Sequence, residues 1–157
     1  MSALDQDIYY MQQALQAAQL AEMQDEVPVG AVLVVNQQLI GSAHNQTLMQ
    51  CDPTAHAEIL LLRQTAKQLK NHRLLGATMY VTLEPCLMCV GAMIQARIKR
   101  LVFGAYDSRL GGITRYGSLL KGANHRFDLT DGLLAEVCAE KLQQFFKHKR
   151  HSPQNSD

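Results

Sequence analysis

The first 62 residues of this 157-residue chain contain no lysine and no arginine. They carry seven acidic residues, whereas the rest of the chain carries all 15 basic residues and the other seven acids. The two parts therefore have formal charges of −7 and +8, although the whole chain is only +1. This near-neutral balance falls short of a strongly basic nucleic-acid-binding domain, but the basic second part permits a polyanionic partner.

Long apolar runs, a signal-like N-terminus and abundant cysteine are also missing. No apolar run reaches about 18 residues, the length that a membrane helix needs, so we expect no membrane association. Asp5 and Asp7 stand where a secretory signal carries basic residues, which predicts a cytoplasmic protein. Four cysteines are too few for a disulfide-stapled secreted domain. In a reducing compartment, the Cys86-x-x-Cys89 spacing indicates metal binding or redox chemistry.

Hydrophobic periodicity predicts helices and strands that alternate along the chain. Helices are expected at 7–24, 53–69, 85–96 and 133–150, and strands at 29–36, 38–44, 78–83, 99–105 and 126–129. The Asn36-Gln37 pair predicts a hairpin, and the Val/Leu run before it is typical of a strand buried on both faces. The glycine-rich stretch 106–125 predicts a long irregular loop or short helix.

This element order predicts an α/β fold with one mixed sheet and helices on both of its faces. We expect a single domain over residues 1–150, because no repeat or linker divides the chain. Residues 151–157 are expected to form a disordered tail.

Three residues near predicted helix starts could share a metal ion. Cys86 and Cys89 are three apart in a first helical turn, so both sulfurs can point to one spot, where the helix dipole favours thiolates. His56 lies in the first turn of the helix predicted from Pro53. One imidazole and two thiolates form a ligand set that suits tetrahedral zinc.

The fourth position around such a zinc decides its role. Four further residues offer a protein ligand for it: Cys51, Cys138, His44 and His125. If one of them filled it, the site would be closed and structural, whereas water there would make the site catalytic, because bound zinc lowers the pKa of water to about 7. Glu58 favours the open site, since a hydroxide nucleophile needs a nearby carboxylate to take and return its proton. A glutamate in a first helical turn is common, so the motifs indicate catalysis only in combination.

The chain as a whole resembles a known family. "HAE" followed by "PCLMC" matches the H-x-E…P-C-x-x-C signature of zinc nucleobase deaminases, for which tRNA adenosine deaminases are a standard example. The strings "EVPVGAVLV", "DPTAHAEI", "TLEPCLMCVGAMI" and "FFKHKR" resemble bacterial tRNA-specific adenosine deaminases, in order from about Asp7 to Arg150. The resemblance implies a three-layer α/β/α cytidine-deaminase-like fold with a five-stranded sheet, and a homodimer.

The implied activity is zinc-dependent deamination of adenosine to inosine at the wobble position of tRNA, with an arginine tRNA of anticodon ACG as the expected substrate. His56, Cys86 and Cys89 would bind one Zn²⁺ per subunit. Glu58 would move protons while hydroxide attacks C6 of adenine and ammonia leaves.

The same resemblance implies residues that bind the anticodon loop. Asn45 would hydrogen-bond the nucleoside, Val29 and Leu83 would sandwich the base, and Asp107 would contact a sugar. Backbone N–H groups of Ala57 and Cys86 would steady the pocket. The segment "FFKHKR" combines aromatic and basic side chains as single-stranded RNA binding requires, through Phe145, Phe146, Lys149 and Arg150. The two phenylalanines could instead complete the packing of the last helix.

Other readings of the sequence stay open. A deaminase of free guanine, cytosine or a small nucleoside would share the zinc core, although the basic second part favours RNA. A non-enzymatic zinc-stabilised RNA-binding module would need four protein ligands. A redox pair at Cys86 and Cys89 would leave His56 and Glu58 unexplained. The loop after Tyr106 also differs from the shorter segment expected in the family, so the chemistry is better determined than the exact RNA.

Overall fold

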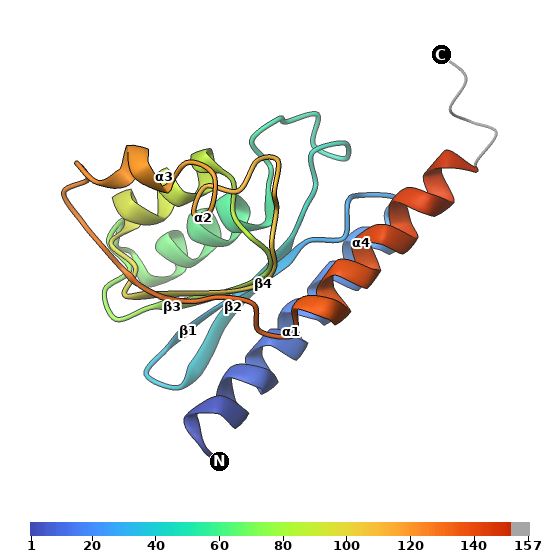
Figure 1. Ribbon diagram of the computed structural model, residues 1–157. Coiled ribbons are helices and arrows are strands. Elements are labelled where there is room, and N and C mark those ends of the chain that lie inside the picture. Colours follow the sequence, from blue (N-terminus) through green and yellow to red (C-terminus); the bar gives the residue numbers. More distant parts are fainter. Residues whose placement is uncertain (152–157) are drawn as a thin grey trace.

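The computed structural model describes residues 1–151, and its centre is a five-stranded sheet of order β2-β1-β3-β4-β5 (Figure 1). The elements are α1 (Ala3–Met23), β1 (Gly30–Val35), β2 (Gln38–His44), α2 (Ala57–Leu69), β3 (Thr78–Leu83), α3 (Leu87–Ala96), β4 (Arg100–Ala105), the 3-10 helix η1 (Gly117–Leu120), β5 (Asp128–Thr130) and α4 (Ala135–Arg150). β1 is antiparallel to both of its neighbours, whereas β3, β4 and β5 are parallel. The predicted α/β fold with one mixed five-stranded sheet is confirmed.

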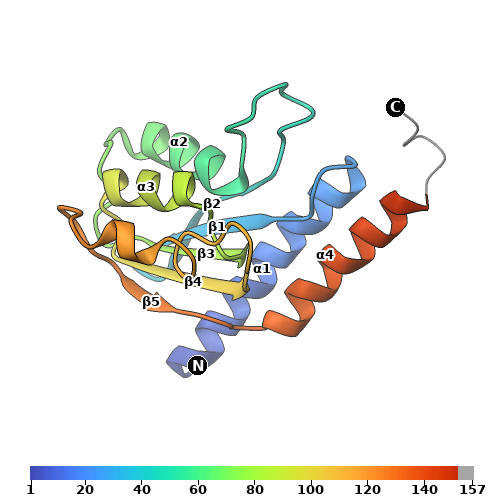
Figure 2. The same cartoon turned by 45° about the horizontal axis from the view of Figure 1, so that its top comes forward.

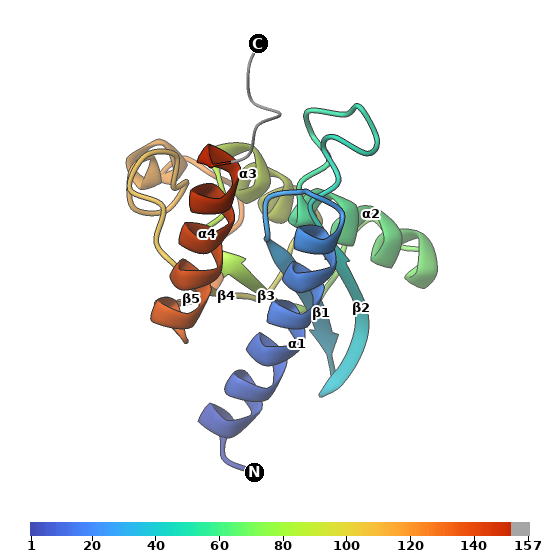
Figure 3. The same cartoon turned by 90° about the vertical axis from the view of Figure 1, so that its right-hand side faces the viewer.

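Helices cover the two faces of the sheet. α1 and α4 lie on one face and α2 and α3 on the other, which gives the three-layer α/β/α arrangement (Figures 2 and 3). The α2/α3 side buries a core that includes Leu61 and Met93 against Met79 and Phe103 of the sheet. Because β1 lies between two helical layers, five of its six residues are buried, as its unbroken apolar run predicted.

The hairpin between β1 and β2 turns at the predicted pair. Asn36 and Gln37 both have positive φ values, 50° and 62°, which is the geometry of the two-residue turns that follow the twist of a hairpin. At the other end of β1, Gly30 lies so close to α1 that an added Cβ would stand 2.1 Å from the carbonyl oxygen of Ala14. Only glycine permits this contact.

Three helix starts differ from the prediction. α1 begins at Ala3 rather than Asp7, because Ser2 forms a capping box with Asp5. α3 begins at Leu87, so Pro85 precedes the helix instead of opening it. α4 begins at Ala135 rather than residue 133, since Leu134 is in the left-handed region.

The start of α2 also differs, and this difference places His56, one of the predicted metal ligands. The helix was predicted from Pro53 but begins at Ala57. Asp52 competes with the helix by accepting hydrogen bonds from the backbone and hydroxyl of Thr54, at 2.8 and 2.7 Å. His56 is therefore the extended N-cap residue of α2, not a first-turn residue. The last strand was predicted at 126–129 and spans Asp128–Thr130 instead.

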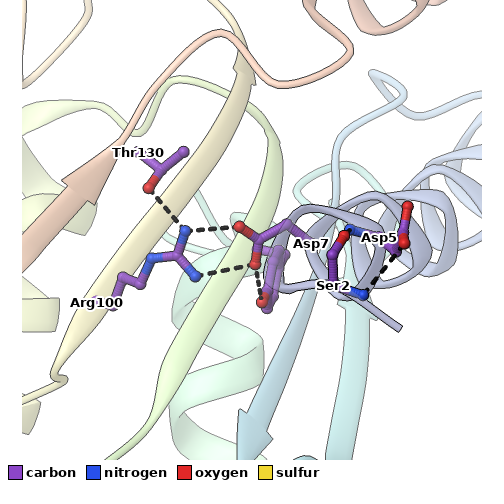
Figure 4. A network of polar contacts seen from close by, with 6 residues as sticks. Ser2, Asp5, Asp7, Arg100 and Thr130 are labelled. Carbon is purple, nitrogen blue, oxygen red and sulfur yellow. Dashed lines mark hydrogen bonds and ion pairs between the residues drawn. The ribbon is translucent and has the colours of Figure 1, made fainter.

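Asp7 joins α1 to the amino ends of β3 and β4 (Figure 4). Arg100 donates two hydrogen bonds to its carboxylate, at 2.9 and 2.7 Å, and Tyr80 donates a third at 2.7 Å. Arg100 also donates to Thr130 of β5 at 2.7 Å. Burial of Asp7 opposes its charge, but the bonds from Arg100 and Tyr80 hold the pKa of this carboxyl below its usual value.

The residue expected to begin the C-terminal tail, His151, caps α4, and the rest of that predicted tail, 152–157, lies outside the described residues. In the described part of the chain, every helix falls short of the combination of length and hydropathy that a membrane span requires.

Candidate active site

The starts of α2 and α3 bring the three predicted metal ligands together. His56 and Cys86 are the N-cap residues of these helices, and both have extended backbones. Nδ1 of His56 lies 3.6 Å from Sγ of Cys86 and 3.5 Å from Sγ of Cys89. The ligand atoms of the three residues all lie within 4.8 Å of one another. A short separation between a ring nitrogen and two sulfurs is what a shared metal ion requires.

These distances fit zinc. Zn–N and Zn–S bonds of usual length, set at a tetrahedral angle, place nitrogen and sulfur about 3.6 Å apart. The observed separations of 3.6 and 3.5 Å match that value. Imidazole and thiolate are also the ligand types that zinc prefers.

The local electrostatics favour a thiolate at Cys86. A hydrogen bond from Cys89, with help from His56 and against burial, lowers the pKa of Cys86 to about 4. The same contact and burial raise the pKa of Cys89. The hydrogen bond with Cys86 raises the pKa of His56. The cluster is therefore arranged around negative charge on sulfur, which a cation would stabilise.

The four other candidate ligands lie elsewhere. His44 is hydrogen-bonded to Gln24 at 3.0 Å, and His125 to the backbone oxygen of Ile98 at 2.7 Å. Cys51 is exposed, whereas Cys138 is buried on the sheet face that α1 and α4 cover. Among residues 1–151 the cluster contains three ligand residues and no fourth.

Glu58 lies in the first turn of α2, close to this cluster. Its side chain is 4% exposed, and burial raises the pKa of its carboxyl, although its own backbone N–H and Cys89 oppose the shift. Burial disfavours the charged form of a carboxyl and so favours the uptake of a proton. Glu58 can therefore both accept and donate a proton.

A pocket of about 530 Å³ opens onto these groups. Its lining includes His56, Cys86 and Glu58. Five other residues expected to bind substrate line the same pocket: Val29, Asn45, Leu83, Asp107 and Phe146. A buried carboxyl, a cluster with the spacing of metal ligands and groups suited to a nucleoside thus share one cavity.

Comparisons with known proteins agree with this geometry. The family model of MafB19-like deaminases matches residues 5–150. The tRNA-specific adenosine deaminase of Haemophilus influenzae is 50% identical over 143 residues, which cover 89% of this chain and 83% of the relative. The Bacillus subtilis tRNA-specific adenosine deaminase is 42% identical and covers 94% of this chain and 92% of its own. The chain belongs to the tRNA-specific adenosine deaminases.

Solved structures support the same family. One, from work on A-to-I editing by tRNA:A34 deaminases at the wobble position of transfer RNA, is 42% identical, with a TM-score of 0.81. The match covers 85% of this chain and 99% of that one. A guanine deaminase from Nitrosomonas europaea is 24% identical, with a TM-score of 0.75, over 88% of this chain and 83% of its own. At that identity the second match shows the shared fold alone.

Not every substrate residue expected for this deaminase faces the pocket. The backbone N–H of Ala57 donates to Oδ1 of Asn45 at 2.8 Å, so this N–H at the start of α2 is occupied by the Asn45 side chain. Phe145 is only 7% exposed, whereas Phe146 is 47% exposed. Phe145 therefore contributes to the packing of the last helix, as the alternative interpretation expected. Of the pair, Phe146 alone lines the pocket.

The basic end of α4 lies beyond the pocket lining. Lys149 forms an ion pair with Asp25, and its ammonium stands 5.6 Å from the centre of the Phe145 ring. Arg150 is exposed. Neither side chain lines the cavity, so any contact they make with RNA would lie outside it.

Sequence reasoning missed part of the pocket wall. Glu84 and Leu142 line the cavity, as do Ser108, Arg109 and Leu110 of the long loop after β4. A signal for Glu84 was present in the sequence, because "TLEPC" places a carboxylate directly between a predicted strand and Pro85. The loop residues carried no such signal, because their position depends on contacts with distant parts of the chain.

Proposed function

We propose that this deaminase converts adenosine to inosine at the wobble position of a tRNA, with a zinc ion held by His56, Cys86 and Cys89. The observation that carries the proposal is the shared pocket, in which Glu58 and the three ligands meet groups suited to a nucleoside. The names of the relatives, which match almost the whole chain, support tRNA as the substrate class.

The chemistry is hydrolytic: adenosine and water become inosine and ammonia. Bound zinc supplies hydroxide at neutral pH by lowering the pKa of water to about 7. Glu58 accepts the proton released from water and delivers it to the ring nitrogen next to C6. As the oxygen from water bonds to C6, Glu58 moves the proton of the new C6 hydroxyl to the amino group, so that the C6–N bond breaks and ammonia leaves. Its burial suits proton uptake, because burial raises the pKa of its carboxyl.

The nucleoside would be held by three kinds of contact. Asn45 has its oxygen occupied by the Ala57 N–H, which leaves its amide NH₂ to donate to the substrate. Val29 and Leu83 supply apolar walls for the base. Asp107 receives the N–H groups of Arg109 and Leu110 on one carboxylate oxygen, at 3.0 Å each, and its other oxygen can accept from a ribose hydroxyl.

The neighbouring nucleotides of an anticodon loop would lie toward α4. Phe146 is exposed at the pocket edge and can stack on an unpaired base, and the Phe145 ring supports it edge-on at 5.5 Å. Lys149 and Arg150 add positive charge for phosphates at the end of the same helix. This arrangement favours RNA over a free base, which would need neither feature.

Three further expectations belong to this proposal. Residues 1–150 act as a single deaminase domain, and the protein works in the cytoplasm, where tRNA and reduced cysteines are found. The active form is a homodimer. Sedimentation equilibrium of the purified protein tests the last point, and a monomer that deaminates RNA at full rate would contradict it.

The deciding experiment incubates the purified protein with an anticodon stem-loop of an arginine tRNA that carries ACG. Inosine is scored by mass, and zinc is measured on the same sample. Inosine together with stoichiometric zinc would support the proposal. Zinc without inosine would contradict the RNA substrate, and parallel reactions with guanine, cytosine and free nucleosides would then identify a smaller one. Absence of zinc would contradict the assigned metal site.

A further inference from the structure

Glu84 is a buried carboxylate at the carboxyl end of β3 whose hydrogen bonds all come from one loop. Its side chain is 2% exposed. Oε1 accepts from the backbone N–H of Asp107 at 3.1 Å, and Oε2 accepts from the N–H groups of Ile113 and Thr114 at 3.1 and 2.8 Å. The Thr114 hydroxyl lies 3.0 and 2.9 Å from the two oxygens and donates to the carboxylate. Both ends of the segment 107–114 are therefore tied to one side chain.

The segment between those ends forms a wall of the substrate pocket. Asp107, Ser108, Arg109 and Leu110 all line it. Within the segment, the backbone N–H of Gly111 donates to the backbone carbonyl oxygen of Asp107 at 3.0 Å. The Gly112 N–H donates to the oxygen of Pro85 at 2.7 Å, beside the metal ligand Cys86. The loop is thus attached to the start of α3 as well as to Glu84.

The loop has a glycine where the carboxylate needs room. A Cβ added to Gly111 would stand 2.2 Å from Oε2 of Glu84, a distance that no side chain could tolerate. Glu84 forms no ion pair with any residue between 1 and 151. Keeping a buried carboxylate without a cation costs free energy unless hydrogen bonds compensate it. The four donors of the loop are that compensation, which indicates that Glu84 is kept for its capacity as an acceptor.

We propose that Glu84 is a positioning residue for substrate binding: it holds the loop 107–114 so that Asp107 and its neighbours face the bound nucleoside. The inference rests on the proposed function, because that function makes this pocket the nucleoside site. Glu84 takes no part in the chemistry. It acts through the loop, so its loss should weaken substrate binding and leave the metal site and the proton carrier in place.

Glutamine at position 84 is an informative replacement because it keeps the shape but loses one acceptor. Its single oxygen can face Ile113 and Thr114, whose two N–H groups need an acceptor. Its NH₂ group then faces the N–H of Asp107, and two donors meet. The Asp107 end of the loop is therefore the end that Glu84→Gln releases.

The test compares Glu84→Gln with wild type and with Asp7→Asn as a matched control. Both variants remove the charge of a buried carboxylate, but Asp7 has no contact with the loop. Loss of one charge-assisted hydrogen bond predicts a KM for the stem-loop about tenfold higher in Glu84→Gln, with kcat within about twofold of wild type. Hydrogen exchange of the backbone amides in 107–114 should be faster in Glu84→Gln alone, and both variants should keep their zinc.

The outcomes separate this inference from the proposed function. Unchanged KM in Glu84→Gln, or an equal rise of KM in Asp7→Asn, would overturn the positioning role, as would loss of zinc in a folded Glu84→Gln. If Glu84→Gln does not fold, Thr114→Val against Thr114→Ser tests the attachment of the other end of the loop to Glu84. If wild type leaves the stem-loop unchanged, the proposed function fails. In that case hydrogen exchange still tests the positioning role: backbone amides in 107–114 that exchange as slowly in Glu84→Gln as in wild type would show that Glu84 does not hold the loop.

Discussion

Two buried carboxylates at opposite ends of the parallel strands, Asp7 and Glu84, do different work. Asp7 is 7% exposed and meets side chains, one of them the cation of Arg100, so it joins α1 to the amino ends of β3 and β4 (Figure 4). Glu84 meets backbone N–H groups and a hydroxyl of one loop, without a cation. Side-chain pairs between rigid elements add stability. A carboxylate that accepts several backbone N–H groups of one loop determines where that loop lies. At the carboxyl ends of the strands, the position of the loop in turn shapes the pocket.

The largest expected effect is a loss of kcat at Glu58, which neither Asp7 nor Glu84 should share. Glu58→Gln keeps the size of the side chain but cannot carry a proton, so we expect kcat to fall about 10²- to 10⁴-fold, the usual contribution of a general acid or base. Zinc content and the urea midpoint should match wild type. Single-turnover deamination of the stem-loop measures the rate. A variant that keeps more than a tenth of the wild-type rate would contradict the role of Glu58.

The next effect should appear in stability alone. Arg100→Met leaves the Asp7 carboxylate buried without its cation, and breaking such a pair is expected to lower the free energy of unfolding by about 3 kcal/mol. Urea unfolding followed by circular dichroism measures this change. At a temperature where the variant is folded, its KM for the stem-loop should equal that of wild type. A raised KM would mean that the two ends of the sheet are not independent.

Acid should weaken the Asp7 end of the molecule. The pKa of Asp7 is lower in the folded protein than its usual value, because the bonds from Arg100 and Tyr80 outweigh burial. Its contribution to stability is therefore complete above the unfolded pKa of about 4 and is lost as the pH falls through the folded pKa. Below about pH 4, wild type should lose stability more steeply than Asp7→Asn. Parallel pH profiles of the two proteins would contradict this assignment.

The smallest expected effect concerns the hydroxyl of Thr114, which donates to Glu84. Thr114→Val removes the one hydroxyl donor to Glu84 and leaves the backbone donors, so KM should rise only about two- to fivefold. Thr114→Ser keeps the hydroxyl and serves as the matched control, with the KM of wild type. Steady-state kinetics on the stem-loop at several concentrations measure both. An equal change in the two variants would mean that the effect does not come from the hydroxyl hydrogen bond.

Helix boundaries show how far local pattern reasoning reaches. The elements were predicted in the correct order, because periodicity reports which face of each is buried. The first residue of α2 was wrong, since the Asp52 side chain satisfies Thr54 locally and delays the helix to Ala57. This error matters for the site, because the delay makes His56 an N-cap residue beside Cys86.

The substrate residues show the limit of that reasoning. Asn45 and Asp107 were named from resemblance to a family, and the structure places both on the pocket. The same segment resemblance treated Phe145 and Phe146 alike, although adjacent residues on a helix point in different directions. One is buried and the other lines the pocket, and only the way in which α4 lies on the sheet distinguishes them.

By itself, the sequence determined the order of helices and strands, the hairpin at Asn36-Gln37 and the residue types of the His-Cys-Cys cluster, because these follow from short-range periodicity, turn chemistry and side-chain chemistry. Only the tertiary structure decided that Glu84 would hold the loop 107–114 and that Asp7 would meet Arg100. Their hydrogen-bond partners lie 23 to 30 and 93 residues away in the chain. Such contacts form only when the parallel strands and α1 are assembled, since a buried carboxylate takes whichever donors the fold brings within reach.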